Sequence, residues 1–264
     1  MDAQSPTPIL QDRLREMAWM APATARLPGI QPLAVDDWMR QDEAFAGQMA
    51  ERDRLITTCP ELVHGLLPDA RPAAEELLAE VLRILSTTQG YAVEAASVIR
   101  PDGIRVALNP EEPLLTLGRL VQEDFVIHLP QEGEHGFRAA ILCFPASWTL
   151  SEKLGRPLTA VHRPVDVYDA GLAARVQRLF DAIRVEQPLW RANALLYEDP
   201  SLFHPLREGE KRPRPLSRNY LRTERQCLFR LPKSQAVVFS IHTTIVHVDN
   251  VPPDALEAFK ALHP

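Results

Sequence analysis

The sequence predicts an α+β fold in which helices come first and an antiparallel sheet with flanking helices follows. Before about residue 90, apolar side chains recur at helical spacing in two stretches. After Tyr91 they fall in short runs that turn signals separate. These runs come in neighbouring pairs, which is typical of hairpins and not of alternating strand–helix units. We therefore expect an N-terminal helical annex over 1–90 and a sheet-based core over 91–264, joined in one compact unit.

The annex is expected to hold two amphipathic helices. The first covers 35–56, where Asp36 or Asp37 can cap the helix, and the second covers about 70–88 with Asp69 as the capping candidate. Their apolar stripes consist of Trp38, Phe45, Met49 and Leu55 in the first helix, and Leu77, Leu78, Val81, Leu82 and Leu85 in the second. Packing in the core is the simplest role for these side chains.

The elements of the core follow from short apolar runs and from the turns between them. We expect extended arms around the Pro-Asp-Gly turn within 98–108, a helix or strand end at 114–120, a hairpin of strands 125–129 and 137–144, a helix over 167–184, strands over 189–198, 221–232 and 236–248, and a C-terminal helix over 253–262. Residues 200–218 are rich in proline and arginine and are expected to form a loop.

Composition argues against several classes of function. The net charge is −6, which does not suit a nucleic-acid-binding protein, and basic residues gather only between Arg207 and Arg230, as a small anionic ligand or acidic partner would require. The three cysteines lie far apart, which excludes a four-cysteine iron–sulfur cluster and indicates a reducing, cytoplasmic setting. The sequence has no glycine-rich phosphate loop and no apolar run that spans a membrane. From the early acidic residues we expect no signal peptide.

His162 has the most unusual setting in the chain. It follows the apolar Thr159-Ala160-Val161 and precedes Arg163 and Pro164, and this proline lacks an amide N–H and restricts the residue before it. A neutral histidine beside such a fixed bend can ligate a metal or a haem iron. The alternative is a histidine that packs and makes one backbone hydrogen bond, as most histidines do.

The strand predicted at 221–230 carries polar groups on both faces. Arg222, Glu224 and Gln226 share one face with Leu228, whereas Thr223, Arg225, Cys227 and Phe229 share the other. If the first face points inward, its groups must pair or hold a polar ligand. If it points outward, it is an ordinary solvated face, and the pattern alone favours this second arrangement.

Other candidate residues are weaker. Arg191 and Asn193 share a strand face and could present donors to a carboxylate. His242 and His247 are five residues apart, so a regular strand sends them to opposite faces and each is expected to be structural. Cys143 lies in an apolar run and is expected to be an inert core thiol, although it remains an alternative axial ligand. If His162 is not a haem ligand, the next candidates are His128, His242 and Cys143.

Four segments together resemble one family. They are VQED (121–124), FPASWTLSEKLGRPLTAVHRPVDVY (144–168), LWRANALLYEDPSLFHP (189–205) and LRTERQCLFRLPKSQAVVFSIHTTIV (221–246). Their order and spacing resemble the haem-dependent oxidative N-demethylase family, which is related to the alpha subunit of dimethylamine monooxygenases. The resemblance covers roughly 35–250. It implies a PAS-like sheet that binds haem b, and oxidative N-demethylation of a small secondary amine with O₂, releasing formaldehyde.

The resemblance also implies roles for individual residues. The family's Trp…EKLG…His-x-Pro-Val motif matches Trp148, the residues 152–155 and His162, so that His162 becomes the proximal haem ligand. Its Arg-x-Glu-Arg-Gln motif matches the residues 222–226. The residues expected near the haem edge or distal pocket are Arg222, Glu224, Arg225 and Gln226, with Arg191 and Asn193 as donors to a propionate. Glu224 would hold the substrate ammonium, and Arg222 or Arg225 would pair with a propionate.

The sequence departs from the family pattern at Leu195, Cys227 and Thr244, where relatives often have Trp, Thr and Tyr. These changes concern the substrate more than the fold. Because the chain has no iron–sulfur motif and no evident flavin site, an oxygenase of this kind needs a separate flavin or iron–sulfur reductase subunit. Two other hypotheses remain: a non-catalytic haem-binding sensor or carrier, and a haem-free interaction protein. A requirement for the Glu224 carboxylate would distinguish the enzyme from the sensor.

Overall fold

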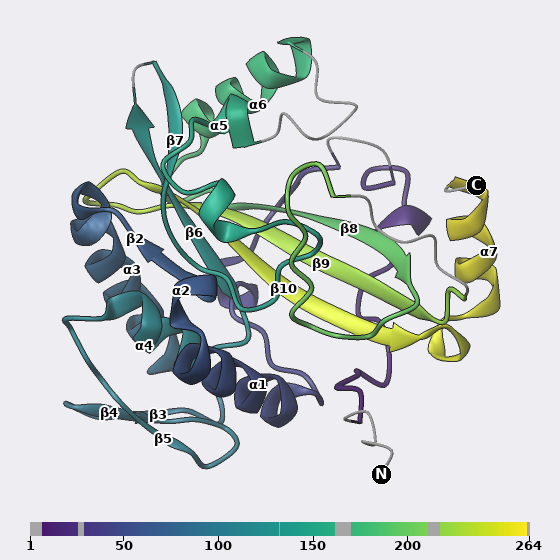
Figure 1. Cartoon of the computed structure of the whole chain (residues 1–264), viewed down its shortest axis with the longest axis horizontal. Helices are drawn as coiled ribbons and strands as arrows, with labels where there is room; N and C mark the ends of the chain where they lie inside the picture. The colour runs from purple at the N-terminus through teal and green to yellow at the C-terminus, as the bar shows by residue number, and fades with distance from the viewer. Residues whose placement is uncertain (1–6, 26–28, 132, 162–169, 211–216, 263–264) are drawn as a thin grey trace.

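The computed structural model describes residues 7–25, 29–131, 133–161, 170–210 and 217–262 (Figure 1). Within these ranges the helices are α1 (Phe45–Thr58), α2 (Pro60–Val63), α3 (Arg71–Leu85), α4 (Pro113–Leu120), α5 (Leu158–Val161), α6 (Ala170–Ala182) and α7 (Pro253–Leu262). The strands are β1 (Gln31–Pro32), β2 (His64–Leu66), β3 (Ala92–Val93), β4 (Ser97–Ile99), β5 (Arg105–Ala107), β6 (Asp124–Gln131), β7 (Glu134–Ile141), β8 (Leu189–Tyr197), β9 (Tyr220–Arg230) and β10 (Val237–His247).

The described strands form one large sheet of seven strands, in the order β1-β8-β9-β10-β6-β7-β2, and a small sheet of β3, β4 and β5. Every pairing in the two sheets is antiparallel. This arrangement confirms the predicted α+β fold. In Figure 1, α7 lies at the opposite end of the molecule from α3, α4 and the small sheet. The PAS-like description of the sheet stays a prediction.

The register of the three long strands decides which side chains meet. Glu224 on β9 stands opposite Asn193 on β8 and opposite Thr243 on β10. Because residues directly opposite each other share a face, the sheet divides its polar residues into two sets. The front face carries Arg191, Asn193, Arg222, Glu224 and Gln226, and the back face carries Ala192, Thr223, Arg225, His242 and Thr244.

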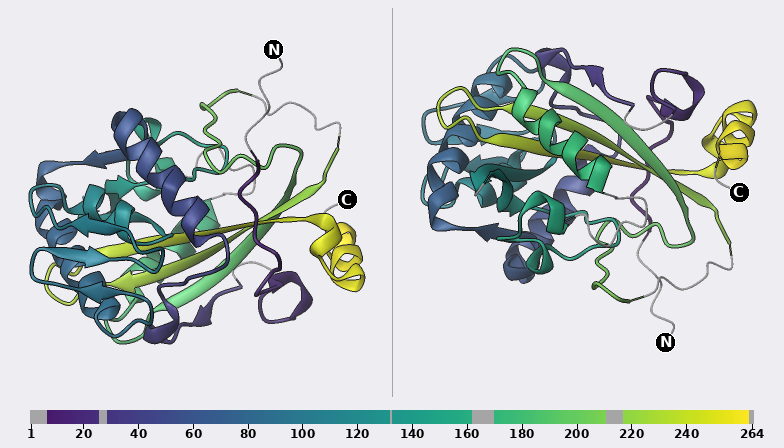
Figure 2. Two further views of the ribbon diagram at one scale, coloured as in Figure 1. Left: turned by 90° about the horizontal axis from the view of Figure 1, so that it is seen from below. Right: turned by 90° about the horizontal axis from the view of Figure 1, so that it is seen from above.

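Different segments cover the two faces. On the front face, α5 and α6 pack against Leu228 and Val237, and the segment 148–161 packs against Val126 and Ile241. On the back face, α7 and the N-terminal segment around Trp19 pack against Leu221 and Val246. The two views of Figure 2 show α1 on one side of the molecule and α6 on the other. The segment that covers part of the front face, 148–161, is thus the one that leads to His162.

Most predicted elements are confirmed. They are the helices α3 and α7, the extended arms β4 and β5, the hairpin of β6 and β7, and the strands β8, β9 and β10. Of the two alternatives for 114–120, a helix or a strand end, the structure has the helix α4. The helix predicted over 167–184 corresponds to α6, while its first residues, 167–169, lie outside the described part of the chain. The short strands β1, β2 and β3 were not predicted, because two or three residues carry no periodic signal.

The prediction of a continuous helix over 35–56 is wrong. Residues 35–37 form a single 3-10 turn, and the α-helix begins only at Phe45. The intervening residues make tertiary contacts with the sheet. The indole of Trp38 donates a hydrogen bond to Ser240 Oγ at 2.8 Å and stacks on Phe229 at a centroid distance of 4.6 Å. Burial of a large aromatic ring on the sheet outweighs a weak local helix propensity.

The predicted helix caps are wrong as well. Asp69 makes no capping hydrogen bond at α3, because its carboxylate accepts one from Arg138 Nε on β7 at 2.9 Å. Asp36 and Asp37 cap no helix either. Asp37 instead pairs with Arg225 Nη2 on the back face at 2.8 Å. In the cases of Asp69 and Asp37, a charge-assisted bond to an arginine replaces the weaker local bond to a backbone amide.

Candidate functional site

Glu224 is the centre of a buried polar cluster on the front face. Its residue exposure is 6%, and Arg222 beside it is 2% exposed, so the prediction of a solvated face is wrong. Glu224 Oε2 accepts hydrogen bonds from Asn193 Nδ2 at 3.2 Å and from Gln226 Nε2 at 3.1 Å. Arg222 Nη2 lies 3.5 Å from Glu224 Oε1. The register of β8 on β9 therefore places three side chains around the Glu224 carboxylate, and we call these four residues the Glu224 cluster.

Arg222 fixes this cluster to two distant segments. Its Nη1 donates to the carbonyl oxygen of Leu202 at 3.1 Å, and its Nη2 donates to that of Phe144 at 2.6 Å. Both carbonyls belong to irregular segments, one after β7 and one after β8. A buried guanidinium that satisfies two loop carbonyls holds those loops against the front face. Arg222 is thus a structural anchor as well as a neighbour of Glu224.

Arg191 is the cation of the front face whose charge is least compensated. It stands opposite Gln226, and its Nε is buried without a hydrogen-bond partner among the described residues. Burial lowers the pKa of Arg191, and the nearby charge of Glu224 opposes that change only in part. The two arginines and the one glutamate leave one net positive charge. An anionic group placed at Arg191 would remove the cost of this burial.

The segment 148–161 lies beside the cluster on the same face. Trp148 is half-buried and meets Phe137 of β7 edge to face at 6.3 Å. Lys153 is buried, and its Nζ donates to the carbonyl oxygen of Val161 and to Glu208 Oε1, both at 2.8 Å. This lysine fixes the end of α5, immediately before His162. His162 itself lies outside the described residues, so its role as ligand stays a prediction.

Arg225 is not brought to the Glu224 cluster. Strand alternation sends it to the back face, where it pairs with Asp37 and lies over the ring of Trp190 at 5.4 Å. The structure thus unites Arg191, Asn193, Arg222, Glu224 and Gln226 and separates them from Arg225. Sequence spacing predicted this separation, whereas the family motif placed all of them near one pocket.

The buried group that sequence reasoning missed is an ion cluster around His242. Its Nε2 lies 3.0 Å from Asp42 Oδ2, and its Nδ1 lies 3.1 Å from Glu123 Oε1. Burial alone would lower the pKa of His242, but hydrogen bonds and charges of the two carboxylates raise it to about 9. The same contacts hold the pKa of Asp42 down at about 2. No local pattern joins residues so distant in the chain.

This geometry bears on the alternative haem ligands. Both ring nitrogens of His242 face carboxylates, so neither is available to an iron. Burial raises the pKa of the Cys143 thiol to about 12, and it is the thiolate that binds metals. In this structure His242 is thus held in ion pairs and Cys143 is a buried thiol.

The His242 cluster predicts a loss of stability at alkaline pH. A histidine whose pKa rises on folding contributes stability that is complete below its unfolded value, near 6.5, and is lost as the pH rises through 9. Asp42 acts in the opposite range, because its contribution disappears only as the pH falls through about 2. Between pH 6.5 and 9.5 we expect the free energy of unfolding to fall by on the order of 3 kcal/mol, measured by urea denaturation.

Two variants serve as controls for that measurement. His242→Gln should lower stability at pH 6.5 and flatten the dependence on pH. His247→Gln, at a partly exposed position of the same strand, should keep the slope of the unchanged protein. An equal slope in His242→Gln and the unchanged protein would show that other groups cause the effect.

The described residues contain no helix with both the length and the apolar character required to cross a membrane. A family model described as "Haem-dependent oxidative N-demethylase, alpha subunit-like" matches residues 29–262, a range that includes all five residues of the front-face set. This match spans far more than half of the 264 residues, and the family's name indicates haem dependence and oxidative N-demethylation. From its sequence match, the chain belongs to the family of proteins resembling the alpha subunit of haem-dependent oxidative N-demethylase.

Proposed function

We propose that this protein is the haem-binding subunit of a monooxygenase that N-demethylates a small secondary amine, such as dimethylamine, with O₂. The observation that carries the proposal is the buried Glu224 cluster beside the segment that leads to His162. A buried carboxylate next to an incompletely compensated arginine is costly for a purely structural sheet. It is suited to a ligand that brings both an anion and a cation to the same face.

The front face fits haem b. The buried Nε atoms of Arg191 and Arg222 have no hydrogen-bond partner among the described residues, and a haem propionate supplies the acceptor that they need. Asn193 and Gln226 would add amide donors at the haem edge, and Trp148 would pack nearby. His162 would be the axial ligand, by the family motif. When bound, the haem would supply the oxidising chemistry.

The amine substrate would sit at Glu224. A secondary amine carries a positive charge at neutral pH, and Glu224 is the carboxylate of the front-face set. The hydrogen bonds from Asn193 and Gln226 restrict the rotation of Glu224, so its free acceptor positions are oriented before the substrate arrives. The net positive charge of the front-face set, which includes Arg191, would be balanced by two propionates and one ammonium together.

Electrons would have to come from another protein. The sequence contains neither an iron–sulfur motif nor an evident flavin site, and the family's name describes an alpha subunit. We therefore propose a separate reductase subunit that carries flavin or an iron–sulfur cluster.

The first test is an absorption spectrum of the purified protein after addition of haem. We expect one haem per chain and a Soret band that shifts on reduction and again with CO, as for a histidine-ligated haem. His162→Ala should weaken haem binding at least about tenfold, because the iron–nitrogen bond is lost, whereas His247→Ala should not. Full haem occupancy with an unchanged ferrous spectrum in His162→Ala would move the ligand to another residue, with His128 next to be tested. An absence of specific haem binding in the unchanged protein would refute the proposal.

A further inference from the structure

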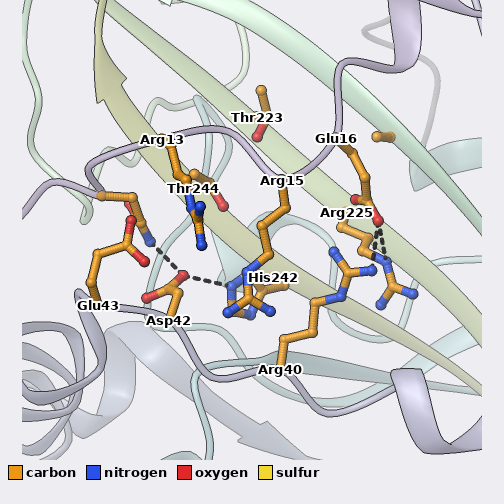
Figure 3. Close-up of a pocket in the computed structure, with 12 residues that line it drawn as sticks. Arg13, Arg15, Glu16, Arg40, Asp42, Glu43, Thr223, Arg225, His242 and Thr244 are labelled. Carbon is orange, nitrogen blue, oxygen red and sulfur yellow. Dashed lines mark hydrogen bonds and ion pairs between the residues drawn. The ribbon is translucent and has the colours of Figure 1, made fainter. Parts of the chain in front are cut away.

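A pocket opens on the back face of the sheet, the face opposite to the Glu224 cluster. It lies between the N-terminal segment and the strands β8, β9 and β10 (Figure 3). Its lining consists of Gln11, Arg13, Arg15, Glu16, Arg40, Asp42, Glu43, Ala192, Thr223, Arg225, His242 and Thr244. We call it the back-face pocket. None of the front-face residues lines it, so the proposed haem chemistry does not account for it.

The cations of this pocket outnumber its carboxylates. Four arginines line it against Glu16, Asp42 and Glu43. The three carboxylates are already engaged in bonds within the protein. Glu16 pairs with Arg40 at 2.5 Å, Asp42 with His242 at 3.0 Å, and Glu43 Oε1 accepts the backbone amide of Asp12 at 2.7 Å.

Arg13 and Arg15 differ from the other two arginines of the pocket, because Arg40 and Arg225 pair with carboxylates. In Figure 3 the side chains of Arg13 and Arg15 extend from the N-terminal segment toward Thr244 and His242, which lie on β10. Arg15 Nη2 donates to the carbonyl oxygen of Gln41, and neither arginine forms an ion pair with any described residue. Two guanidinium groups that line one pocket in this way can form several charge-assisted hydrogen bonds with a single oxyanion.

The floor of the pocket offers further donors. Arg225 has a side chain that is 4% exposed, and its Nε forms no hydrogen bond with any described residue, with Glu16 Oε1 3.6 Å away. Thr223 and Thr244 share its face of the sheet and line the same pocket. A buried guanidinium N–H without an acceptor is costly, and an oxyanion in the pocket would satisfy it.

We propose that the back-face pocket binds one phosphate or carboxylate group of a small anionic ligand, held by Arg13 and Arg15 with Arg225 and the two threonines beneath. Planar guanidinium groups recognise both phosphates and carboxylates. The experiment below distinguishes these two kinds of anion. The site lies on the opposite face from the proposed haem and does not depend on it.

Titration calorimetry of the haem-loaded full chain with inorganic phosphate and, separately, with acetate tests this proposal. Both titrations use sodium chloride to hold the ionic strength constant. We expect saturable binding of at least one anion, and the stronger of the two identifies the source as phosphate or carboxylate. Replacing both arginines, as Arg13→Gln with Arg15→Gln, should weaken that binding by more than about tenfold, because the charge-assisted hydrogen bonds to the anion are lost.

A matched control removes the same charge elsewhere. Arg54→Gln with Arg83→Gln replaces two exposed arginines on α1 and α3, with side-chain exposures of 55% and 62%, and should leave anion binding unchanged. Unaltered anion binding in the Arg13/Arg15 variant would place the site elsewhere. An equal loss in both double variants would reveal a general effect of net charge. Either result, or the absence of saturable binding in the unchanged protein, overturns the proposal.

Discussion

Replacing Arg52 by methionine is expected to lower the free energy of unfolding by about 3–5 kcal/mol, which is a large part of the stability of an ordinary domain. Arg52 lies on α1 with a fully buried side chain, and Asp124 at the start of β6 is 1% exposed. Their Nη1–Oδ1 distance is 2.7 Å. The substitution would leave the Asp124 carboxylate buried without its counter-ion, and an unpaired buried charge is among the most destabilising of single changes.

The loss would extend beyond the ion pair. Arg52 also donates to three backbone carbonyls, that of Gly118 in α4 and those of Gln122 and Glu123 in the turn between α4 and β6. The Asp124 carboxylate accepts hydrogen bonds from the backbone amides of Cys143 and Phe144. The ion pair therefore fixes two segments, the turn that leads into β6 and the residues that follow β7. Methionine fills the volume of the aliphatic stem but satisfies none of these polar groups.

The same pair connects to the candidate site. Asp124 binds the amide of Phe144, and the carbonyl oxygen of Phe144 accepts the hydrogen bond from Arg222 Nη2. We thus expect that Arg52→Met also loosens the wall of the Glu224 cluster.

Arg54 offers a matched control on the same helix. Its side chain is 55% exposed and pairs with Glu51 one turn away. Arg54→Met should change the free energy of unfolding by less than about 0.5 kcal/mol in the same urea titration, because exposed pairs contribute little. Similar losses in the two variants would mean that helix α1 tolerates no methionine at these positions, and would refute the role given to Asp124.

How far the sequence predicts the site depends on the range of the physical signal. Alternation along a strand is local, so the spacing of residues alone separates Glu224 from Arg225. Whether that face points inward is not local. It depends on the segment 148–161, which packs on the front face, and on Leu202 and Phe144, whose carbonyls bind Arg222. Pattern alone therefore favours the wrong arrangement.

The buried ion clusters could not be predicted from the sequence either, because their partners are also distant in the chain. In the sequence Arg52 looks like any charged residue on an amphipathic helix, and its partner stands 72 residues later. His242 meets Glu123 and Asp42 across 119 and 200 residues. The prediction of a helix over 35–56 is wrong because Trp38 and Asp42 bind residues of β10 instead. Such long-range pairs override local propensity, and periodicity cannot reveal them.

On the function proposed above, Glu224→Gln should abolish the response of the haem spectrum to the amine while leaving haem bound. The amide keeps the size of the side chain and an oxygen that can accept from Asn193 or Gln226, so the sheet should keep its geometry. The negative charge that would hold the substrate ammonium is lost. Removal of one partner of a buried charge pair costs about 2–5 kcal/mol, so amine affinity should fall at least about 30-fold.

The measurement is a titration of the haem-loaded protein with dimethylamine, followed at the Soret band. Glu186→Gln makes the same chemical change at an exposed position just before β8 and should leave the titration unaltered. Loss of haem in Glu224→Gln would instead assign the carboxylate a structural role at the haem edge. If haem stays bound and the amine response survives undiminished, Glu224 is not the ammonium site. The hypothesis of a sensor or carrier with the same haem pocket, which needs no carboxylate for O₂ or CO, would then be the stronger one.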